Sequence, residues 1–356
     1  MNQTRINRVL ANMRRDKLSC ILVSDPVSVY YLTGRMIHPG ERMLALSILS
    51  DGRLELFVNR LFPQESEASL PVVSFDDTDD CVAILADTLP PGKIGIDKNW
   101  PSRFTLRLME LRPDIWPVLG SAPVDDARML KGADEIELMR VSSRLNDEAL
   151  RKTIETIKEG DTELEVGRRY VEAGKKLGAS GASFGALICF GANCAEPHHA
   201  TDETVLKEGD SVILDVGLNV NNAMSDMTRT VFLGRPTDEQ TEVYELVKAA
   251  NEAGRRAAQP GVPLCEIDRA AREVIEKGGY GQYFIHRTGH GIGLEVHEPP
   301  DVSSTSEIPA QPGMIFSVEP GIYLPGKFGV RIEDLVLITP DGGETLNSLP
   351  RKLITL

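Results

Sequence analysis

Acidic residues stand inside or beside apolar segments that have the length of buried strands, and this placement limits the possible folds most. Asp215 interrupts the apolar run at 212–217, which reads VILDVG, and Asp226 follows on the far side of a polar stretch. That stretch includes asparagines at 219, 221 and 222, and asparagine favours tight turns. A hairpin that turns there would bring the two carboxylates onto neighbouring strands, close enough to share an ion.

A second pair of carboxylates repeats this arrangement further along the chain. Glu319 follows the apolar segment at 314–318, and Glu333 precedes the apolar segment at 335–338. The turn formers Pro and Gly stand between them at 325–326. The sequence therefore predicts two matched hairpins, each with one pair of carboxylates.

Four carboxylates in apolar surroundings require neutralisation. An ionised carboxylate costs several kcal/mol to bury unless it is ion-paired or bound to a metal. A single aspartate in a strand is more often ion-paired, but that explanation needs a separate partner for each of the four charges. Two divalent cations would neutralise all four at once. Five of the six histidines lie after residue 195, and His290 stands among glycines. We therefore predict a dinuclear metal site whose ligands include one or two histidines.

The order of the predicted elements indicates two domains. A length of 356 residues allows about two domains at roughly 150 residues each. Helix-like and strand-like segments alternate in 1–125, which predicts a small α/β domain. In 126–356 helices and strands fall into separate blocks, which predicts an α+β domain with duplicated strand-rich halves. The predicted strands of the first domain lie near 20–24, 44–49, 54–58, 72–75 and 93–97, and the second domain has strand blocks at 210–234 and 313–339, helices at 238–258 and 264–277, and a long helix that Asp134 would cap.

Charge and cysteine content exclude several classes of protein. The chain carries 53 acidic and 39 basic residues, a formal net charge of −14. Such acidity argues against a nucleic-acid-binding protein, which needs a basic face for the phosphates. The five cysteines include no CxxC pair, as expected of free thiols in a reducing compartment. The first thirty residues lack a secretory signal pattern, and no apolar stretch reaches the ~18 residues of a membrane helix. We therefore expect a cytoplasmic protein.

Several short segments together resemble a known family. The catalytic region resembles the pita-bread metallopeptidases, most closely the Xaa-Pro dipeptidases (prolidases) and the aminopeptidases P. Two segments near the start, YYLTG at 30–34 and HPGER at 38–42, look like the creatinase/prolidase N-terminal domain. The catalytic segments are DVG at 215–217, SDMTRT at 225–230, HRTGHGIG at 286–293, VHE at 296–298, SVEPG at 317–321 and RIED at 331–334.

The resemblance implies a set of site residues and a reaction. Asp226 and Glu333 would bridge two ions, and Mn²⁺ suits an oxygen-rich shell with one imidazole, with Co²⁺, Fe²⁺ or Zn²⁺ as alternatives. A bridging hydroxide would attack the scissile carbonyl, and Glu319 would pass the proton to the leaving imino nitrogen. The implied metal ligands are Asp215, Asp226, His290, Glu319 and Glu333, the implied catalytic residues are Glu319, His198 and His297, and His198, His286, His297 and Arg331 would contact substrate.

An Xaa-Pro bond fits such a site, because proline lacks an N–H by which a peptidase could hold the amide. Many dipeptidases of the family have an arginine after the His-Glu-x-Pro stretch to hold the substrate carboxylate. Residues 299–313 contain no Lys or Arg, so this task falls to Arg287, to Arg331 or to a partner subunit. The alternatives are therefore an Xaa-Pro aminopeptidase acting on longer peptides and a related hydrolase of another small amide. A methionine aminopeptidase or a non-enzymatic binding protein of the same fold fits the sequence less well.

The remaining histidines have other expected roles. His286 is expected to line the pocket beside His290, and His199 to point away from it, into solvent or a subunit contact. His38 reads as a surface residue, with a role at the active site of a neighbouring subunit as the alternative. The N-terminal domain and the family resemblance together predict a homodimer.

Overall fold

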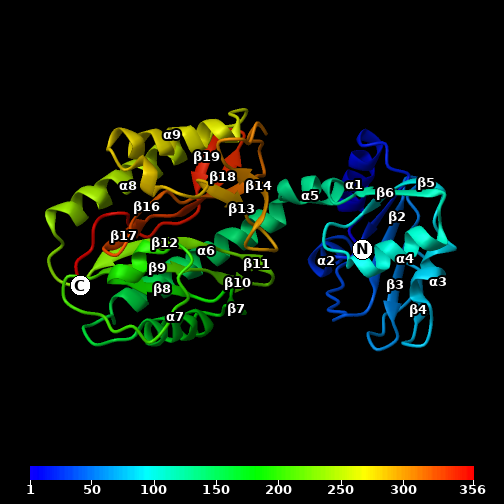
Figure 1. Ribbon diagram of the computed structural model, residues 1–356, viewed down its shortest axis with the longest axis horizontal. Coiled ribbons are helices and arrows are strands. Elements are labelled where there is room, and N and C mark those ends of the chain that lie inside the picture. Colours follow the sequence, from blue (N-terminus) through cyan, green and yellow to red (C-terminus); the bar gives the residue numbers. More distant parts are fainter. The chain divides into compact units, whose positions relative to one another are not determined.

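The computed structural model describes all residues, 1–356, and divides into two compact units, Met1–Arg128 and Met129–Leu356. Figure 1 shows the chain coloured along its length. The first unit has an α/β architecture and the second a mixed architecture of several sheets under helices, so the predicted fold class is confirmed. No helix is both long and apolar enough to cross a membrane.

The first unit is built on one six-stranded sheet in the order β4-β3-β2-β1-β5-β6. The hairpin β2–β3 is antiparallel, and its turn contains Asp51 and Gly52, with Gly52 at φ +93°. Its strands are β1 Cys20–Val23, β2 Leu44–Leu49, β3 Leu54–Asn59, β4 Val72–Phe75, β5 Gly92–Ile96 and β6 Ile115–Leu119, and its helices are α1 Gln3–Arg15, α2 Pro26–Thr33, α3 Cys81–Ala86 and α4 Ser102–Leu111, followed by α5 Ala122–Met129.

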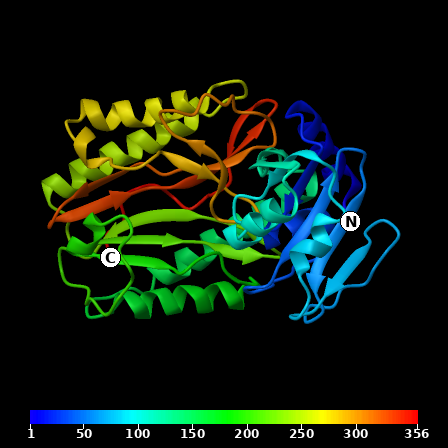
Figure 2. The ribbon, with the colours of Figure 1, turned by 45° about the vertical axis from the view of Figure 1, so that its right-hand side comes forward.

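The second unit places its strands between two pairs of helices. Figures 1 and 2 show the strands between α7 (green) on one side and α8 and α9 (yellow) on the other. Its helices are α6 Ala133–Ile154, α7 Glu163–Lys176, α8 Asp238–Ala257 and α9 Leu264–Lys277, with 3₁₀ turns η1 Gly191–Ala195 and η2 Gly281–Tyr283. Its strands are β7 Gly181–Ala182, β8 Leu187–Phe190, β9 Ser211–Val216, β10 Leu218–Val220, β11 Ala223–Met224, β12 Met227–Phe232, β13 Gly289–Gly291, β14 Glu298–Val302, β15 Ile315–Val318, β16 Gly321–Leu324, β17 Phe328–Arg331, β18 Asp334–Thr339 and β19 Gly342–Thr345.

The start of α6 differs from the prediction, and α7 begins in a similar way. The cap position of α6 is Gly132, not Asp134, and the Gly132 N–H donates to the carboxylate of Glu135 at 2.8 Å. The cap of α7 is Thr162, which together with Glu165 forms a reciprocal capping box. Both helices therefore begin with a glutamate three residues into the helix that returns to the cap.

Both predicted strand pairings are present, but neither is a simple hairpin, because two short strands stand between the partners in each case. Strand β9 pairs antiparallel with β12, with Asp215 opposite Thr228, and the turn at Asn221 and Asn222, both at positive φ, joins the short strands β10 and β11. Strand β15 pairs antiparallel with β18, with Val318 opposite Asp334. The two carboxylates of each pair therefore lie in or next to paired strands, at the same end of the strand pair.

Alternation along β9 decides which way Asp215 points. The side chains of Val212, Leu214 and Val216 are fully buried in one apolar cluster together with Tyr170 of α7. Because successive side chains of a strand point to opposite faces, Asp215 is directed away from that cluster. The aspartate therefore belongs to the inner face of the strand rather than to the helix-covered core.

Candidate metal centre

The five predicted ligand residues lie around one cavity of about 440 Å³. They come from five different strands of the second unit or the residues next to them. Asp215 and Asp226 stand at the end of β9 and just before β12, His290 stands within β13, and Glu319 and Glu333 directly follow β15 and precede β18. The cavity is lined by Phe184, Gly185, Leu187, Pro197, His198, Asp215, Asp226, His286, Arg287, His290, Val296, His297, Glu319, Arg331 and Glu333.

The ligand atoms of three of these residues converge closely. Potential ligand atoms of Asp226, His290 and Glu333 all lie within 4.8 Å of one another, and all three residues are buried. The Nε2 atom of His290 lies 3.2 Å from Oε1 of Glu319 and 3.8 Å from Oδ2 of Asp226. Carboxylate oxygens and one imidazole nitrogen at these separations form a donor set that suits a divalent transition metal.

Three carboxylate oxygens in this cavity are buried and have no hydrogen-bond partner. They are Oδ1 of Asp215, Oδ1 of Asp226 and Oε1 of Glu333. A buried polar atom without a partner costs about 1–3 kcal/mol, and more when it carries charge. Carboxylate oxygens without hydrogen-bond partners are free to ligate a cation, and all three belong to residues that line one cavity. These residues therefore fit a site for divalent metal ions.

The electrostatics of the carboxylates are consistent with that fit. Burial raises the pKa of Asp226 well above its ordinary value, and the charge of Glu333 raises it further. Burial and the charge of Glu319 likewise raise the pKa of Glu333. Although burial opposes it, the hydrogen bond and charge of His290 lower the pKa of Glu319 to about 2. Without a cation, therefore, burial and mutual repulsion oppose the simultaneous ionisation of Asp226 and Glu333.

Arg331 holds the Asp215 side of the centre. Its Nη2 donates to Oδ2 of Asp215 at 2.6 Å, and its Nε donates to the Thr228 hydroxyl at 3.1 Å. The Thr228 hydroxyl in turn donates to Oε2 of Glu333 at 2.7 Å. Arg331 and Thr228 therefore fix one oxygen on each of two carboxylates and leave the other oxygen of each free.

The Ser317 hydroxyl links His290 to Glu319 through hydrogen bonds. The backbone N–H of His290 donates to Oγ of Ser317 at 3.0 Å, and that hydroxyl donates to Oε1 of Glu319 at 3.0 Å. Ser317, Thr228 and Tyr323 were not among the predicted contacts of the site. Ser317 and Thr228 lie within the family segments, and Ser317 stands between two apolar residues of its strand, which was the available signal.

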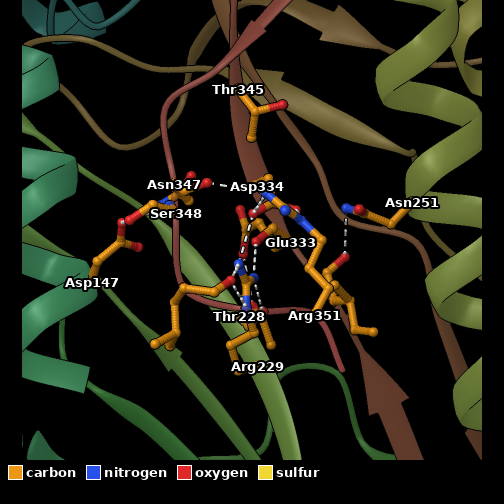
Figure 3. A network of polar contacts seen from close by, with 12 residues as sticks. Asp147, Thr228, Arg229, Asn251, Glu333, Asp334, Thr345, Asn347, Ser348 and Arg351 are labelled. Atoms are coloured by element: carbon orange, nitrogen blue, oxygen red, sulfur yellow. Dashed lines mark hydrogen bonds and ion pairs between the residues drawn. The ribbon is translucent and has the colours of Figure 1, made fainter. Parts of the chain in front are cut away.

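Glu333 is also fixed through its backbone by a buried polar network. Figure 3 shows Arg229 and Arg351 converging on Asp334, the residue after Glu333. The Nη2 of Arg229 lies 2.8 Å from Oδ1 of Asp334, and its Nη1 donates to the Glu333 carbonyl at 2.6 Å. Arg255 approaches the same aspartate at 3.6 Å. The Glu333 backbone is therefore held on one side while its carboxylate faces the cavity.

Three further predicted site residues, all histidines, line the same cavity. The ring of His297 packs edge-on against His290, with ring centroids 4.2 Å apart. Burial and the charge of His290 lower the pKa of His297 to about 4, so the ring is neutral near pH 7. His286 is bonded through Nε2 to the Tyr323 hydroxyl at 2.8 Å and lies outside any helix. His198 enters the cavity from the segment after η1.

His199 does not line the cavity, as expected, but its ring points into the protein rather than into solvent. Its Nε2 lies 2.9 Å from Oε2 of Glu163, a fully buried carboxylate on α7, and its side chain is 12% exposed. Oε1 of Glu163 also accepts from the Phe190 N–H at 2.8 Å and from the Asn193 amide at 2.9 Å. A buried carboxylate requires several donors, and His199 is one of them. His38, by contrast, is exposed on the first unit, as expected of a surface residue.

The chain matches two protein-family models and several solved structures. The model of metallopeptidase family M24 matches residues 137–340, and that of the creatinase/prolidase N-terminal domain matches residues 5–130. A prolidase from Thermococcus sibiricus is 35% identical, with a TM-score of 0.92 and 100% of both chains covered. An X-Pro aminopeptidase from Thermotoga maritima is 30% identical, with a TM-score of 0.80, covering 97% of this chain and 100% of that one. An uncharacterized peptidase of Staphylococcus aureus is 35% identical over 96% of this chain and 98% of its own length.

Proposed function

The chain belongs to metallopeptidase family M24, and from this premise we propose that it hydrolyses Xaa-Pro dipeptides at a dinuclear centre. The observation that carries the proposal is the group of three buried carboxylate oxygens without hydrogen-bond partners in one cavity. The likeness to prolidase structures over the whole chain supports the choice of substrate.

The proposed ligands are the five residues that surround the cavity. Asp226 and Glu333, each with one unpartnered oxygen, would be among the residues that hold two divalent cations, and Mn²⁺ suits the oxygen-rich set best. Bound cations would polarise the scissile carbonyl and lower the pKa of the attacking water. The remaining ligands in this proposal are Asp215, His290 and Glu319.

Glu319 is the proposed proton carrier. Its carboxylate can accept a proton from the attacking water. The Ser317 hydroxyl donates to Oε1 of Glu319, so Oε2 is the oxygen left to move the proton. Transfer from that oxygen to the proline nitrogen would let the imino product leave.

Two histidines are the proposed contacts to the reacting amide. His297, neutral near pH 7, can donate an N–H to the carbonyl oxygen as that oxygen gains charge in the transition state. His198 lines the same cavity and is the second candidate donor. Since proline offers no N–H, holding the substrate from its carbonyl side is the arrangement that an Xaa-Pro bond demands.

A second candidate is an aminopeptidase acting on longer Xaa-Pro peptides. The observation that favours it is an adjoining cavity of about 450 Å³ that shares Arg287 and His297 with the first. A residue after the proline could extend into this second cavity. The likeness to the X-Pro aminopeptidase from Thermotoga maritima points the same way.

One comparison of substrates tests the proposal. The protein supplied with Mn²⁺ should release proline from Ala-Pro and should leave Ala-Ala and Met-Ala-Ser largely intact. Faster cleavage of Ala-Pro-Pro than of Ala-Pro would select the aminopeptidase. Cleavage of Met-Ala-Ser in preference to both Xaa-Pro substrates would contradict the proposal.

A further inference from the structure

A dipeptide substrate ends in a free carboxylate next to the scissile bond, and a site for dipeptides needs a cation to bind it. Only two Lys or Arg side chains line the cavity, Arg287 and Arg331. The adjoining cavity adds no further Lys or Arg to its walls. Among the residues that line these two cavities, Arg287 and Arg331 are therefore the two side chains that could bind the substrate carboxylate.

Arg331 is already committed to the metal centre. Its side chain is 4% exposed and forms an ion pair with Asp215 at 2.6 Å. Its remaining nitrogens donate to the hydroxyls of Thr228 and Tyr323, both at 3.1 Å. A substrate carboxylate could reach this guanidinium only by displacing bonds that hold a proposed metal ligand in place.

Arg287 is accessible and stands where the two cavities meet. It lines both of them, and its side chain is 37% exposed. Its one ion pair, with Asp301, uses only Nη1. A guanidinium has five N–H donors in a planar fork, so Nη2 and Nε remain to bind a carboxylate.

The acidic residues of the second cavity leave Arg287 able to attract a negatively charged ligand. The Asp301 side chain is 58% exposed, and an exposed ion pair of this kind is worth only about 0–1 kcal/mol. Glu298, the other acid in the wall of the second cavity, is buried against Lys131 at 2.8 Å. The other polar residues of that wall include the hydroxyl side chains of Ser303, Thr305 and Ser306.

We propose that Arg287 binds the terminal carboxylate of the dipeptide and so selects substrates that end at proline. This inference rests on the proposed Xaa-Pro dipeptidase function. Arg287 stands on the segment before β13, so in this chain the carboxylate is bound from a different element than the loop after His297, which offers no Lys or Arg.

The test compares Ala-Pro with its C-terminal amide, Ala-Pro-NH₂, which lacks the negative charge. For Arg287→Gln we expect the KM for Ala-Pro to rise about 10- to 100-fold, the range for a lost charge-assisted hydrogen bond, and that for the amide to change less than about threefold. Arg287→Lys keeps the charge and should recover part of the loss. The matched control, Arg235→Gln, removes an exposed arginine that lines neither cavity, and both substrates should behave as with the wild type. Equal effects of Arg287→Gln on both substrates, or none on either, would overturn the inference.

A binding measurement separates this inference from the proposed function. By calorimetry the wild type should bind proline more tightly than prolinamide, and Arg287→Gln should lose that preference even if no Xaa-Pro peptide is hydrolysed. In that event the proposed function fails while the role of Arg287 stands. A wild type that hydrolyses Ala-Pro but shows no carboxylate preference, or one whose preference survives Arg287→Gln, overturns only the role of Arg287.

Discussion

Glu333 and Asp334 are adjacent, equally buried acids with opposite electrostatic surroundings. Arg229 and Arg351 bond Asp334, and although burial opposes them, their charges lower its pKa. Glu333 has one oxygen on the Thr228 hydroxyl and another without a partner, and burial and the charge of Glu319 raise its pKa. One acid is therefore neutralised by the protein itself, whereas the other needs a bound cation.

This contrast predicts stability changes of opposite sign in the metal-free protein. Glu333→Gln removes a charge that is costly to bury, so its free energy of unfolding should equal or exceed that of the wild type. Asp334→Asn, the matched control, leaves buried arginines without their partner and should cost about 3–5 kcal/mol. Denaturant unfolding after chelation measures both variants. Similar destabilisation by both would contradict the contrast.

The effect of Glu333→Gln has a definite dependence on pH. Below the ordinary pKa of a carboxyl group, Glu333 is protonated in both the folded and the unfolded chain. As the pH rises above it, the unfolded chain ionises freely while the folded chain resists, because its pKa is raised. The wild type therefore loses stability with rising pH, and the relative advantage of the variant should grow from about pH 5 to pH 8. An advantage that shrinks over this range would contradict the assignment.

At the residue scale the sequence could identify candidates but not their partners. The apolar context marks both Glu333 and Asp334 as buried acids. What distinguishes them is Arg229 on the preceding hairpin and Arg351 near the chain end, and nothing in the local pattern indicates that these side chains converge on Asp334. Likewise, the local sequence does not indicate that His199 points into the protein, because its partner Glu163 lies 36 residues earlier.

At the scale of elements, the segment after η1 owes its position to α7. Glu163 at the start of that helix accepts from His199, from the Asp202 N–H at 3.0 Å and from Asn193 within η1. These contacts bracket His198, which faces the cavity. We therefore treat His199 as a positioning residue for His198.

This role predicts a partial loss of activity with the metal retained. His199→Ala should lower kcat/KM for Ala-Pro by about tenfold and stability by about 1–3 kcal/mol, because Glu163 loses a donor while buried. His199→Gln can still donate a hydrogen bond and should restore much of the activity. Assays with elemental analysis of each variant separate the two effects. Full activity in His199→Ala, or equal losses in both variants at equal stability, would refute the positioning role.

The elements that the sequence predicted well are those set by local pattern. Strands β2 and β3 and the antiparallel partners of β9 and β15 follow from apolar runs that flank turn residues. Helix starts were less accurate, since Gly132 rather than Asp134 occupies the cap of α6, where Glu135 supplies the hydrogen bond. The segment after η1 could not be predicted, because its contacts depend on a separate helix.

At the scale of the whole molecule, the second unit completes its site by joining its two strand blocks. The Glu333 N–H donates to the Thr228 carbonyl at 3.1 Å, and Arg229 pairs with Asp334 across the same junction. Each block alone would present only two of the four carboxylates. The centre is therefore a property of the completed unit rather than of either hairpin.

The first unit has features that agree with the expected homodimer. Its edge strand β6 exposes Trp116 at 67% and Leu119 at 73%, and the neighbouring helix α4 exposes Leu106. Exposed apolar side chains on an unpaired edge strand favour association. Light scattering should give twice the mass of one chain at micromolar concentration. A mass of one chain that does not change with concentration would contradict this expectation.

Two divalent cations per chain are expected to neutralise the buried carboxylates of the cavity. Elemental analysis of the wild-type protein, equilibrated with Mn²⁺ and freed of unbound metal, measures their number. We expect two ions per chain, fewer in Glu333→Gln and an unchanged number in the control Arg235→Gln. A wild-type protein that binds no metal under these conditions, yet folds and cleaves Ala-Pro, would contradict this assignment.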